Sequence, residues 1–303
     1  MKHECYKDEV EGNTYKSKIS VLAFDNTSEL AKYLKTVPTN NIWKNKNLDS
    51  DQEKSSGFND FNSLKEAVQA LEYGTDMYYK DFKKNKKKVQ DFIRKREQNK
   101  NASYKNDRVG FIPIVPKVIQ GHPVNMVNQD IRPKPYPTAR ILIDKSNSAG
   151  INSKNMCEFY SIIFVLIQLL ENKGIRCEIW TVEAGECGDE ITIHKLKLKN
   201  YTQPLNTFKI QFPIIASDYL RRIVFRLMET NPDIKNDWAW GYGHPLHTTY
   251  DEEICQKIIK VEEGDIYIPS CQHFKYKIDK DLDGTIEEII NGTNLKNYIK
   301  LDK

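Results

Sequence analysis

The sequence predicts an α/β fold of the Rossmann type, with a parallel sheet covered by helices, plus an α-rich N-terminal accessory region. The main observation is a strand, helix and strand in succession: residues 140–144 form a buried strand, 154–173 an apolar helix and 175–182 a second strand. Such a βαβ unit implies parallel strands joined by a right-handed crossover. A later strand at 265–269 extends the same pattern.

The composition is that of a folded chain with one large or two modest domains. The chain has 303 residues, and its net charge of +4 is a small difference between 46 basic and 42 acidic residues. This near balance excludes a protein that is strongly basic as a whole. The six cysteines contain no CxxC pair, which is typical of a reducing compartment. The longest apolar stretch, 162–170, is about half of what a membrane span needs, so we expect a cytoplasmic protein.

Residues 1–74 are expected to form an N-terminal α+β region. A strand at 19–24 precedes a short helix that ends before a proline. A second helix begins after Asn62 or Ser63, either of which can cap it, while Glu66 reaches back toward the free amides. The capping pattern predicts that a helix begins at this point.

Residues 75–107 are predicted to form a basic helical arm. Ten Lys or Arg residues and three acidic residues lie between positions 80 and 100, and aromatic side chains recur at helical spacing among them. Two interpretations remain open. The helix is either a solvated helix packed by its aromatic stripe, or a surface that contacts nucleic acid or an acidic partner, for which Lys84, Lys87 and Lys88 are the candidate residues.

The third predicted segment, 108–303, is an α/β domain with a proline-rich lead-in and a C-terminal extension. Six of the 12 prolines lie in residues 108–137, so this stretch is expected to be extended and wrapping. Within the domain, residues 205–215 are expected to form a strand, and Ser217 is expected to cap a helix with apolar residues at helical spacing.

A short polar motif follows the first strand of the βαβ unit. Residues 144–148 read DKSNS, so that Asp144, Ser146 and Ser148 form a D-x-S-x-S pattern. Ligand sites of open α/β sheets lie at the carboxyl ends of strands. A carboxylate and two hydroxyl groups on a tight turn are suitable oxygen ligands for a divalent cation. The alternative is a metal-free turn in which these side chains cap the next helix.

The motif resembles the metal-ion-dependent adhesion site of von Willebrand factor A-type domains, and the resemblance covers roughly residues 138–270. It implies a Rossmann-like core with a divalent cation, Mg²⁺ or Ca²⁺, at Asp144, although no cofactor is required. In that family a Thr and an Asp from later loops complete the site. The nearest matches by spacing are Thr207 and either Asp233 or Asp237.

Other patterns that suggest catalysis or metal binding are incomplete. Residues 279–285 match the start of an EF-hand loop, but Ile290 stands where the bidentate Glu is needed, so a turn before a capped helix is the alternative. Cys271 and His273 share a face only if their segment is extended. The chain has no G-x-S-x-G, Walker or H-E-x-x-H motif, so we expect a protein that is not an enzyme.

An aromatic, glycine-rich loop at 238–247 is the most unusual local composition. It contains Trp238, Trp240, Tyr242 and His244, and aromatic loops of this kind often form contact surfaces. One interpretation is a ligand or partner site. The other is an ordered loop that plugs the surface of its own domain.

The whole chain also resembles a group of bacteriophage-encoded proteins of unknown function. The resemblance rests on a Phe-x-x-Phe/Ser-x-x-Glu-Ala segment at 58–67 and a Gly-x-Pro-x-x-Met segment at 121–126. It implies a viral protein of the host cytoplasm that forms homo-oligomers, needs no membrane and inhibits a host antiphage-defence complex, for example a Gabija-type nuclease and helicase. The alternatives are a structural or assembly protein of the virion and a metal-dependent enzyme that acts on nucleic acid.

Overall fold

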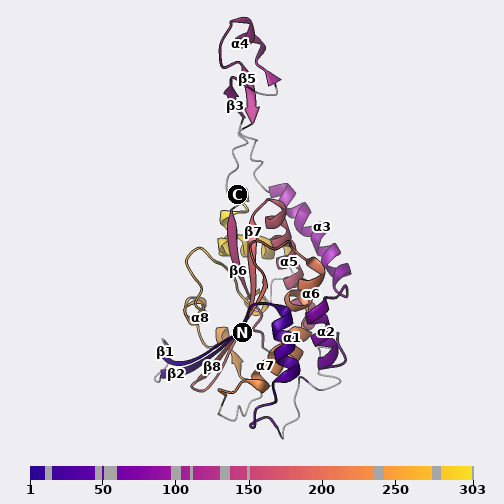
Figure 1. Ribbon diagram of the computed structural model, residues 1–303, viewed down its shortest axis with the longest axis vertical. Helices are drawn as coiled ribbons and strands as arrows, with labels where there is room; N and C mark the ends of the chain where they lie inside the picture. Colours follow the sequence, from indigo (N-terminus) through magenta and orange to yellow (C-terminus); the bar gives the residue numbers. More distant parts are fainter. Residues whose placement is uncertain are drawn as a thin grey trace.

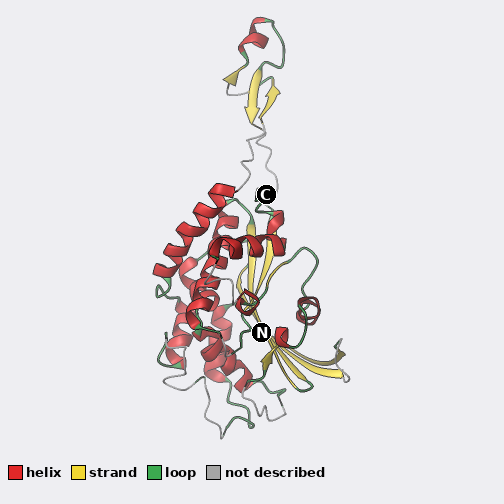
Figure 2. Ribbon diagram, turned by 180° about the vertical axis from the view of Figure 1, so that it is seen from behind, coloured by secondary structure: helices red, strands yellow, loops and turns green. Residues whose placement is uncertain are grey.

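A central sheet organises the protein, and a smaller sheet stands apart from it (Figure 1). The computed structural model describes residues 1–10, 16–44, 50, 60–96, 104–109, 112–129, 137–148, 151–234, 242–274 and 281–301. Within these residues the central sheet has seven strands, in the order β1-β2-β8-β7-β6-β10, and β9 pairs with β7. Most of the helices lie together along one side of the body (Figure 2).

The strands of the central sheet are β1 (Lys2–Glu9), β2 (Lys16–Phe24), β6 (Thr138–Asp144), β7 (Arg176–Cys187), β8 (Glu190–Lys199), β9 (His244–Pro245) and β10 (Ile266–Ile268). As predicted, β6 runs parallel to both β7 and β10. The strands β7 and β8 form an antiparallel hairpin, and β8 then pairs in parallel with β2. The predicted α/β class is confirmed. Because β1 and β2 complete this sheet, the N-terminal region and the βαβ unit share one sheet.

The helices cover the two faces of the sheet unequally. The face that includes Ile141, Ile143 and Ile179 packs in the larger apolar core, whereas Leu142 and Val182 point to the opposite face and pack in a smaller core with α8. The helical elements are α1 (Thr27–Thr36), α2 (Leu64–Tyr73), α3 (Tyr79–Arg96), α5 (Ser153–Asn172), α6 (Thr207–Ile215), η1 (Tyr219–Val224), α7 (Phe225–Thr230), η2 (Leu246–Thr248), α8 (Glu252–Ile259), η3 (Cys271–Phe274), α9 (Leu282–Gly292) and η4 (Asn294–Asn297).

Helix α5 is the crossover between β6 and β7 and a core helix of the body. Its side chains from Phe159 to Ile167 are all buried, in agreement with the predicted apolar helix. Gly174, with a φ of 80°, ends it. Among the described helices α5 alone is long and apolar enough to cross a membrane, but most of it is buried inside the protein, as is typical of a core helix.

Helix α2 begins with the capping arrangement that the sequence predicts. The Ser63 hydroxyl accepts a hydrogen bond from the Glu66 N–H at 3.2 Å, and the Glu66 carboxylate accepts one from the Asn62 N–H at 2.9 Å. Two of the amides that a helix leaves without partners are thereby satisfied. The predicted start of this helix is therefore confirmed.

Two predictions for residues 205–230 are wrong in detail. The expected strand at 205–215 is helix α6, whose first turn is capped by the Asn206 side chain. Residues 210–215 are all buried, and an apolar run without a polar face does not distinguish a strand from a helix. The next helix exists as predicted, but it starts with the π-helical turn η1 and has no side-chain cap, so Ser217 does not play that role.

The proline-rich segment folds into a small sheet instead of wrapping around the body. We call this part, residues 104–109 and 112–129, the arm. It differs from the basic helical arm predicted for residues 75–107, whose helix α3 ends at Arg96 and whose last residues, 104–107, form a strand. It contains β3 (Tyr104–Asp107), β4 (Ile112–Pro113), α4 (Val115–Ile119) and β5 (Met126–Gln129), and both strand pairs are antiparallel. In Figure 1 the arm projects beyond the end of the body where α3 ends. The prolines exclude a long helix but allow this short hairpin-like unit.

A buried polar pair fastens the chain before α2 to the turn η1. The Asp218 carboxylate accepts a hydrogen bond from the Phe61 N–H at 2.8 Å, and Arg222 donates to the carbonyls of Ser50 and Phe61 at 3.0 and 3.1 Å. Arg222 and Asp218 are both fully buried. Burial raises the pKa of Asp218 to about 6, because the carboxylate loses its contact with water.

This pKa leads to a test by pH. A carboxyl group whose folded-state pKa lies above its unfolded value of 3.8 stabilises the fold fully at low pH and loses that contribution as the pH rises to about 6. Between pH 4 and 7, we expect the free energy of unfolding of the wild type to fall by up to about 3 kcal/mol relative to that of Asp218→Asn. Urea unfolding across this range measures the difference. Asp76→Asn, which changes an exposed Asp, is the control. If the free energy of unfolding of Asp218→Asn depends on pH in the same way as that of the wild type, the prediction is contradicted.

Candidate functional site

The D-x-S-x-S motif lies at the carboxyl end of β6, where the sequence places it, and the side-chain oxygen atoms of Asp144 and Ser146 form hydrogen bonds within the protein, while the Ser148 N–H donates to the Gln272 amide oxygen at 3.1 Å. Asp144 is buried, and its two carboxylate oxygens accept hydrogen bonds from the Ser146 N–H and from the Tyr267 hydroxyl, each at 2.8 Å. The Ser146 hydroxyl accepts from the Ala184 N–H at 2.8 Å. Burial raises the pKa of Asp144. Asn152 and not the motif caps α5, so the expected capping of this helix by the motif is wrong, and cation binding at the turn stays a prediction.

Lys145, between Asp144 and Ser146, points to the opposite face of the sheet. Its amine donates to the carbonyl of Ile214 at 2.6 Å and lies 3.5 Å from the centroid of the Tyr160 ring. The Tyr160 hydroxyl in turn donates to the Asp144 carbonyl at 2.7 Å. Lys145 is fully buried, and burial lowers its pKa to about 7. The motif thus links β6 to the helices α5 and α6.

The other predicted metal ligands are not brought to this turn. Thr207 is the first residue of α6, whereas Lys145 contacts Ile214 at the far end of the same helix, roughly 10 Å away at 1.5 Å per residue. Asp237 lies outside the described residues. Within the described part of the chain, no group of three His, Cys, Asp or Glu side chains is arranged to hold a metal ion.

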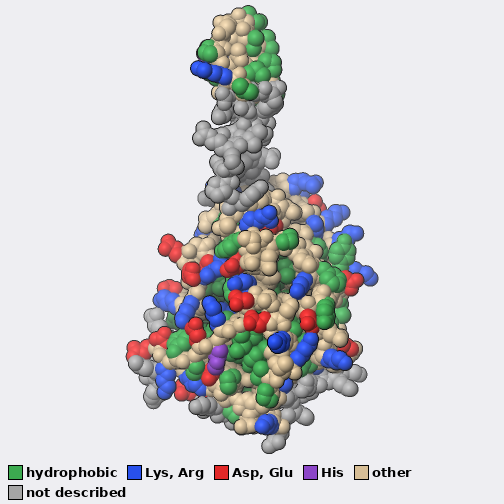
Figure 3. All heavy atoms as spheres, viewed as in Figure 1, with side chains coloured by type: hydrophobic (Ala, Val, Ile, Leu, Met, Phe, Trp, Pro, Cys, Tyr) green, Lys and Arg blue, Asp and Glu red, His purple; other side chains and the backbone are tan. Residues whose placement is uncertain are grey.

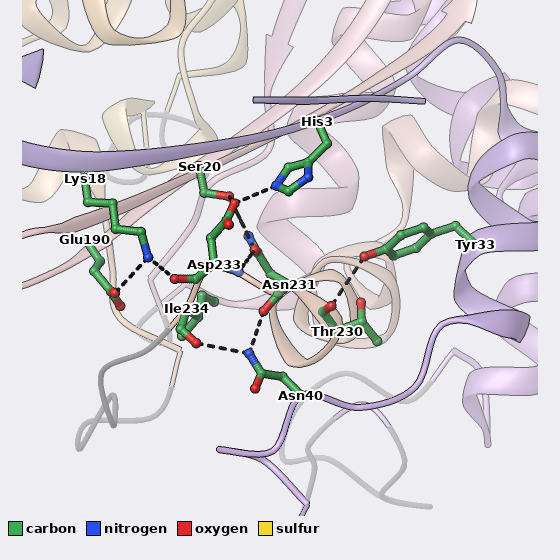
Figure 4. A network of polar contacts seen from close by, with 10 residues as sticks. All are labelled: His3, Lys18, Ser20, Tyr33, Asn40, Glu190, Thr230, Asn231, Asp233 and Ile234. Atoms are coloured by element: carbon green, nitrogen blue, oxygen red, sulfur yellow. Dashed lines mark hydrogen bonds and ion pairs between the residues drawn. The ribbon is translucent and has the colours of Figure 1, made fainter. Parts of the chain in front are cut away.

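Asp233, the other candidate from the resemblance, belongs to a separate polar network at the edge of the sheet (Figure 4). Its carboxylate lies 2.6 Å from His3 Nε2 and accepts a hydrogen bond from the Ser20 hydroxyl at 2.7 Å. Asn231 also contacts Ser20, at 3.0 Å, and Lys18 donates to the Asp233 carbonyl. The network joins β1 and β2 to the chain after α7, which indicates a structural role.

A pocket of about 340 Å³ lies beside Asp144 on the side of α8. Its polar lining includes His247, whose Nε2 lies 3.0 Å from the Gln272 amide oxygen, and Ser270, whose hydroxyl lies 3.3 Å from the same nitrogen. Cys255 also lines the pocket, but burial raises the pKa of its thiol to about 12, which opposes the thiolate form that a nucleophile needs. The pocket can hold a small polar molecule, and the Cys255 thiol in its lining is not activated as a nucleophile.

Two weaker catalytic or metal patterns also have structural roles in this geometry. Cys271 and His273 lie in the 3-10 turn η3, not in an extended segment, and the Cys271 thiol is buried against the Asn155 carbonyl. Residues 279 and 280 of the EF-hand-like stretch lie outside the described residues. Asp281 caps α9 by accepting from the Gly284 N–H at 2.8 Å, which is the alternative interpretation of that stretch.

The aromatic loop contributes one described ring to the core. Trp238 and Trp240 lie outside the described residues. The Tyr242 ring stacks between Phe225, at 3.8 Å between centroids, and Trp43, at 5.0 Å, and its hydroxyl donates to Glu229. The Tyr242 side chain therefore packs against its own domain. His244 lies in β9, is exposed and pairs with Glu186 of β7, and its role in partner binding stays a prediction.

The basic helix α3 has two different faces. Its aromatic stripe is buried against the body, as the solvated-helix interpretation requires. On the outer side Lys84 and Lys87 are exposed, while Lys88 is partly buried and lies 3.4 Å from the Glu158 carboxylate. The role of these three lysines in partner binding stays a prediction.

Large exposed hydrophobic side chains occur in two groups that the sequence reasoning missed. Ten such residues are found in the described chain, and apart from Met1 each lies on the arm or near the start of α3. The arm carries Val109, Ile112, Val115, Val118 and Ile119. The second group, which we call the aromatic corner, is Tyr73, Met77, Tyr79 and Phe208. For the arm, the sequence does show apolar residues between the prolines. Whether their side chains are exposed depends on the tertiary structure.

The family comparison covers almost the whole chain but brings no activity with it. A family model described as "Domain of unknown function (DUF7192)" matches residues 6–297. No curated protein and no solved structure matches the chain. Function therefore has to be argued from the geometry above.

The internal hydrogen bonds of the D-x-S-x-S turn predict that divalent cations leave the fold unaffected. A ligand present at 100 times its dissociation constant stabilises a protein by about 2.7 kcal/mol, which raises the melting temperature by several degrees. We expect millimolar Mg²⁺ or Ca²⁺ to shift the melting temperature of the wild type no more than that of Asp144→Asn. Calorimetry with chelator as reference measures this. A cation-dependent rise that Asp144→Asn abolishes and Asp251→Asn retains contradicts the prediction.

Proposed function

The chain belongs to the DUF7192 family, and we propose that it is a non-enzymatic protein-binding protein that assembles into homo-oligomers through its arm. The observation that carries this proposal is the apolar surface of the arm. Five large hydrophobic side chains are exposed there, and Ile119 is 80% exposed.

The arm has too little structure to bury these side chains by itself. Its helix α4 contains no buried residue, and β4 is only two residues long. Small sheets of this kind need a further packing surface for stability in water. Covering apolar surface is favourable by about 25 cal/mol per Å², so a protein surface that covers the arm gains this energy. A patch of such side chains is typical of a protein interaction site.

The position of the arm favours a contact with another chain. It stands away from the helices and the sheet of the body (Figure 1), so the body does not cover its exposed face. In the space-filling view, green side chains lie mainly on one side of the arm, and basic atoms lie at its opposite edge (Figure 3). A second copy of the chain offers the same surface, and two identical arms form a self-complementary interface.

In its narrower form the proposal is an inhibitor of a host antiphage-defence complex, such as a Gabija-type nuclease and helicase, made by a bacteriophage. This form rests on the resemblance of the 58–67 and 121–126 segments. The von Willebrand A-like character of the core is part of the same proposal and is supported by the strand, turn, helix and strand order of residues 138–187. An oligomer that presents several copies of one surface suits the enclosure of a large complex by avidity.

Light scattering of the purified protein tests the assembly. We expect the wild type to have a mass of at least twice the 35.3 kDa of one chain. The double variant Ile112→Asp, Ile119→Asp places charges on the apolar face and is expected to be a monomer with unchanged circular dichroism. His122→Ala, which removes an exposed polar side chain of the arm, is the matched control and keeps the wild-type mass.

A wild-type protein that is monomeric at tens of micromolar, or a double variant that keeps the wild-type mass, overturns the proposal. A pull-down from bacterial lysate with the wild type and the double variant then tests the narrower form. Recovery of a stoichiometric defence complex supports it, and presence of the chain in purified virions supports the structural alternative instead.

A further inference from the structure

We propose that the outer face of α3 and the aromatic corner together bind single-stranded nucleic acid. We call the outer residues of this helix the lysine face: Lys80, Lys83, Lys84 and Lys87. The lysine face supplies positive charge for phosphates, and the neighbouring rings supply surfaces on which bases stack. This inference is independent of the arm.

The inner contacts of α3 decide which side chains form the lysine face. Phe82, Val89 and Phe92 are buried, and the Asn85 amide donates to the Ser161 hydroxyl of α5. The four lysines follow one another at intervals of three, one and three residues, which places them along one side of the helix. All four are exposed, and none forms an ion pair with a described residue.

Positive charge predominates next to the lysine face, where Asp81 and Asp91 are the two acidic residues of α3. An open hollow of about 860 Å³ along α3 is lined by Tyr79 and six lysines, and Asp91 is the single acidic residue among its described lining. Lys88 and Arg96, toward the rest of the body, are already paired with Glu158 and Glu287. Figure 3 shows basic side chains gathered along the edge of the body where Figure 1 places α3. A linear row of unpaired ammonium groups is complementary to a polyanion.

The aromatic corner is built from the end of α2, the start of α3 and the first turn of α6. Tyr73 ends α2, and Phe208 lies in the first turn of α6. Gly74, with a φ of 93°, makes this approach possible, because a Cβ at that position would lie 2.4 Å from a Phe208 ring atom. The Thr75 N–H donates to the Phe208 carbonyl at 3.3 Å, which holds the two segments together. Tyr73, Tyr79 and Phe208 are 69%, 53% and 48% exposed.

The combination favours a single strand over the other polyanions. A duplex offers phosphates to the lysine face but keeps its bases stacked inside, so it leaves the exposed rings uncovered. An acidic protein segment carries carboxylates but no flat bases. Stacking of a base on an aromatic ring contributes about 1–3 kcal/mol, and it is tolerant of sequence because every base has a π-face.

Fluorescence anisotropy with a labelled oligothymidylate of about 16 nucleotides tests the proposal on the full-length protein. The first variant is Lys83→Ala, Lys84→Ala, Lys87→Ala. We expect it to bind at least tenfold more weakly at about 50 mM salt. The slope of log K against log salt is expected to fall by about 2, since each phosphate contact on a single strand contributes about 0.7.

The matched control removes the same charge elsewhere. Lys7→Ala, Lys154→Ala, Lys300→Ala changes three exposed lysines outside α3 and is expected to bind as the wild type does. The stacking variant, Tyr79→Ala with Phe208→Ala, is expected to weaken oligothymidylate binding about tenfold and duplex binding not at all.

Four results overturn the proposal. The wild type fails to bind oligothymidylate at low salt, or the control triple variant loses as much affinity as the lysine-face variant. Duplex of equal length binds as tightly as the single strand, with no effect of the stacking variant. Polyglutamate competes as well as unlabelled oligothymidylate, which assigns the lysine face to an acidic protein partner.

Discussion

A buried lysine at the end of β6 connects the sheet to its helical layer. Helix α6 ends inside the protein, and carbonyl groups of a last helical turn have no partner within the helix. The Lys145 amine reaches the carbonyls of Ile214 and Ala216, at 2.6 and 3.5 Å, and packs on the Tyr160 ring. Burying an amine without acceptors costs several kcal/mol, so these contacts are needed to keep it in the core. The positions of α5 and α6 on the sheet depend on this side chain.

The same lysine explains why the D-x-S-x-S turn acts as a structural joint. Side chains alternate along a strand, so when Lys145 points to the helices Asp144 points to the opposite face. There the Asp144 carboxylate meets the Tyr267 hydroxyl of β10, and the Ser146 hydroxyl meets the backbone of β7. The turn thus holds three parallel strands and two helices in register. Two residues of a motif with the residue types of a cation site, Asp144 and Ser146, thus contribute their side-chain oxygen atoms to this joint.

The exposed features of the molecule are separate from this buried joint. The arm presents side chains that need a covering protein surface, and the lysine face presents charge that needs a polyanion. The arm follows α3 along the chain, so both surfaces belong to one half of the sequence. In the two proposals, the arm binds protein and the lysine face binds nucleic acid. The sheet and helices of the body support both surfaces.

Local sequence determined the elements whose signals lie within a few residues. The Ser63 and Glu66 cap, the apolar helix of residues 153–172 and the β-rich runs on either side of it needed no distant partner to be recognised. Tertiary structure decided the rest. Residues 207–215 are helical although their apolar run fits a strand equally well, because the consecutive buried residues from 210 to 215 leave no amphipathic period that would distinguish the two. β2 joins β8, about 170 residues away, by backbone pairing that no local pattern encodes. The partners of Asp144 and the exposure of Phe208 likewise depend on which surfaces meet, and that is a property of the packed chain.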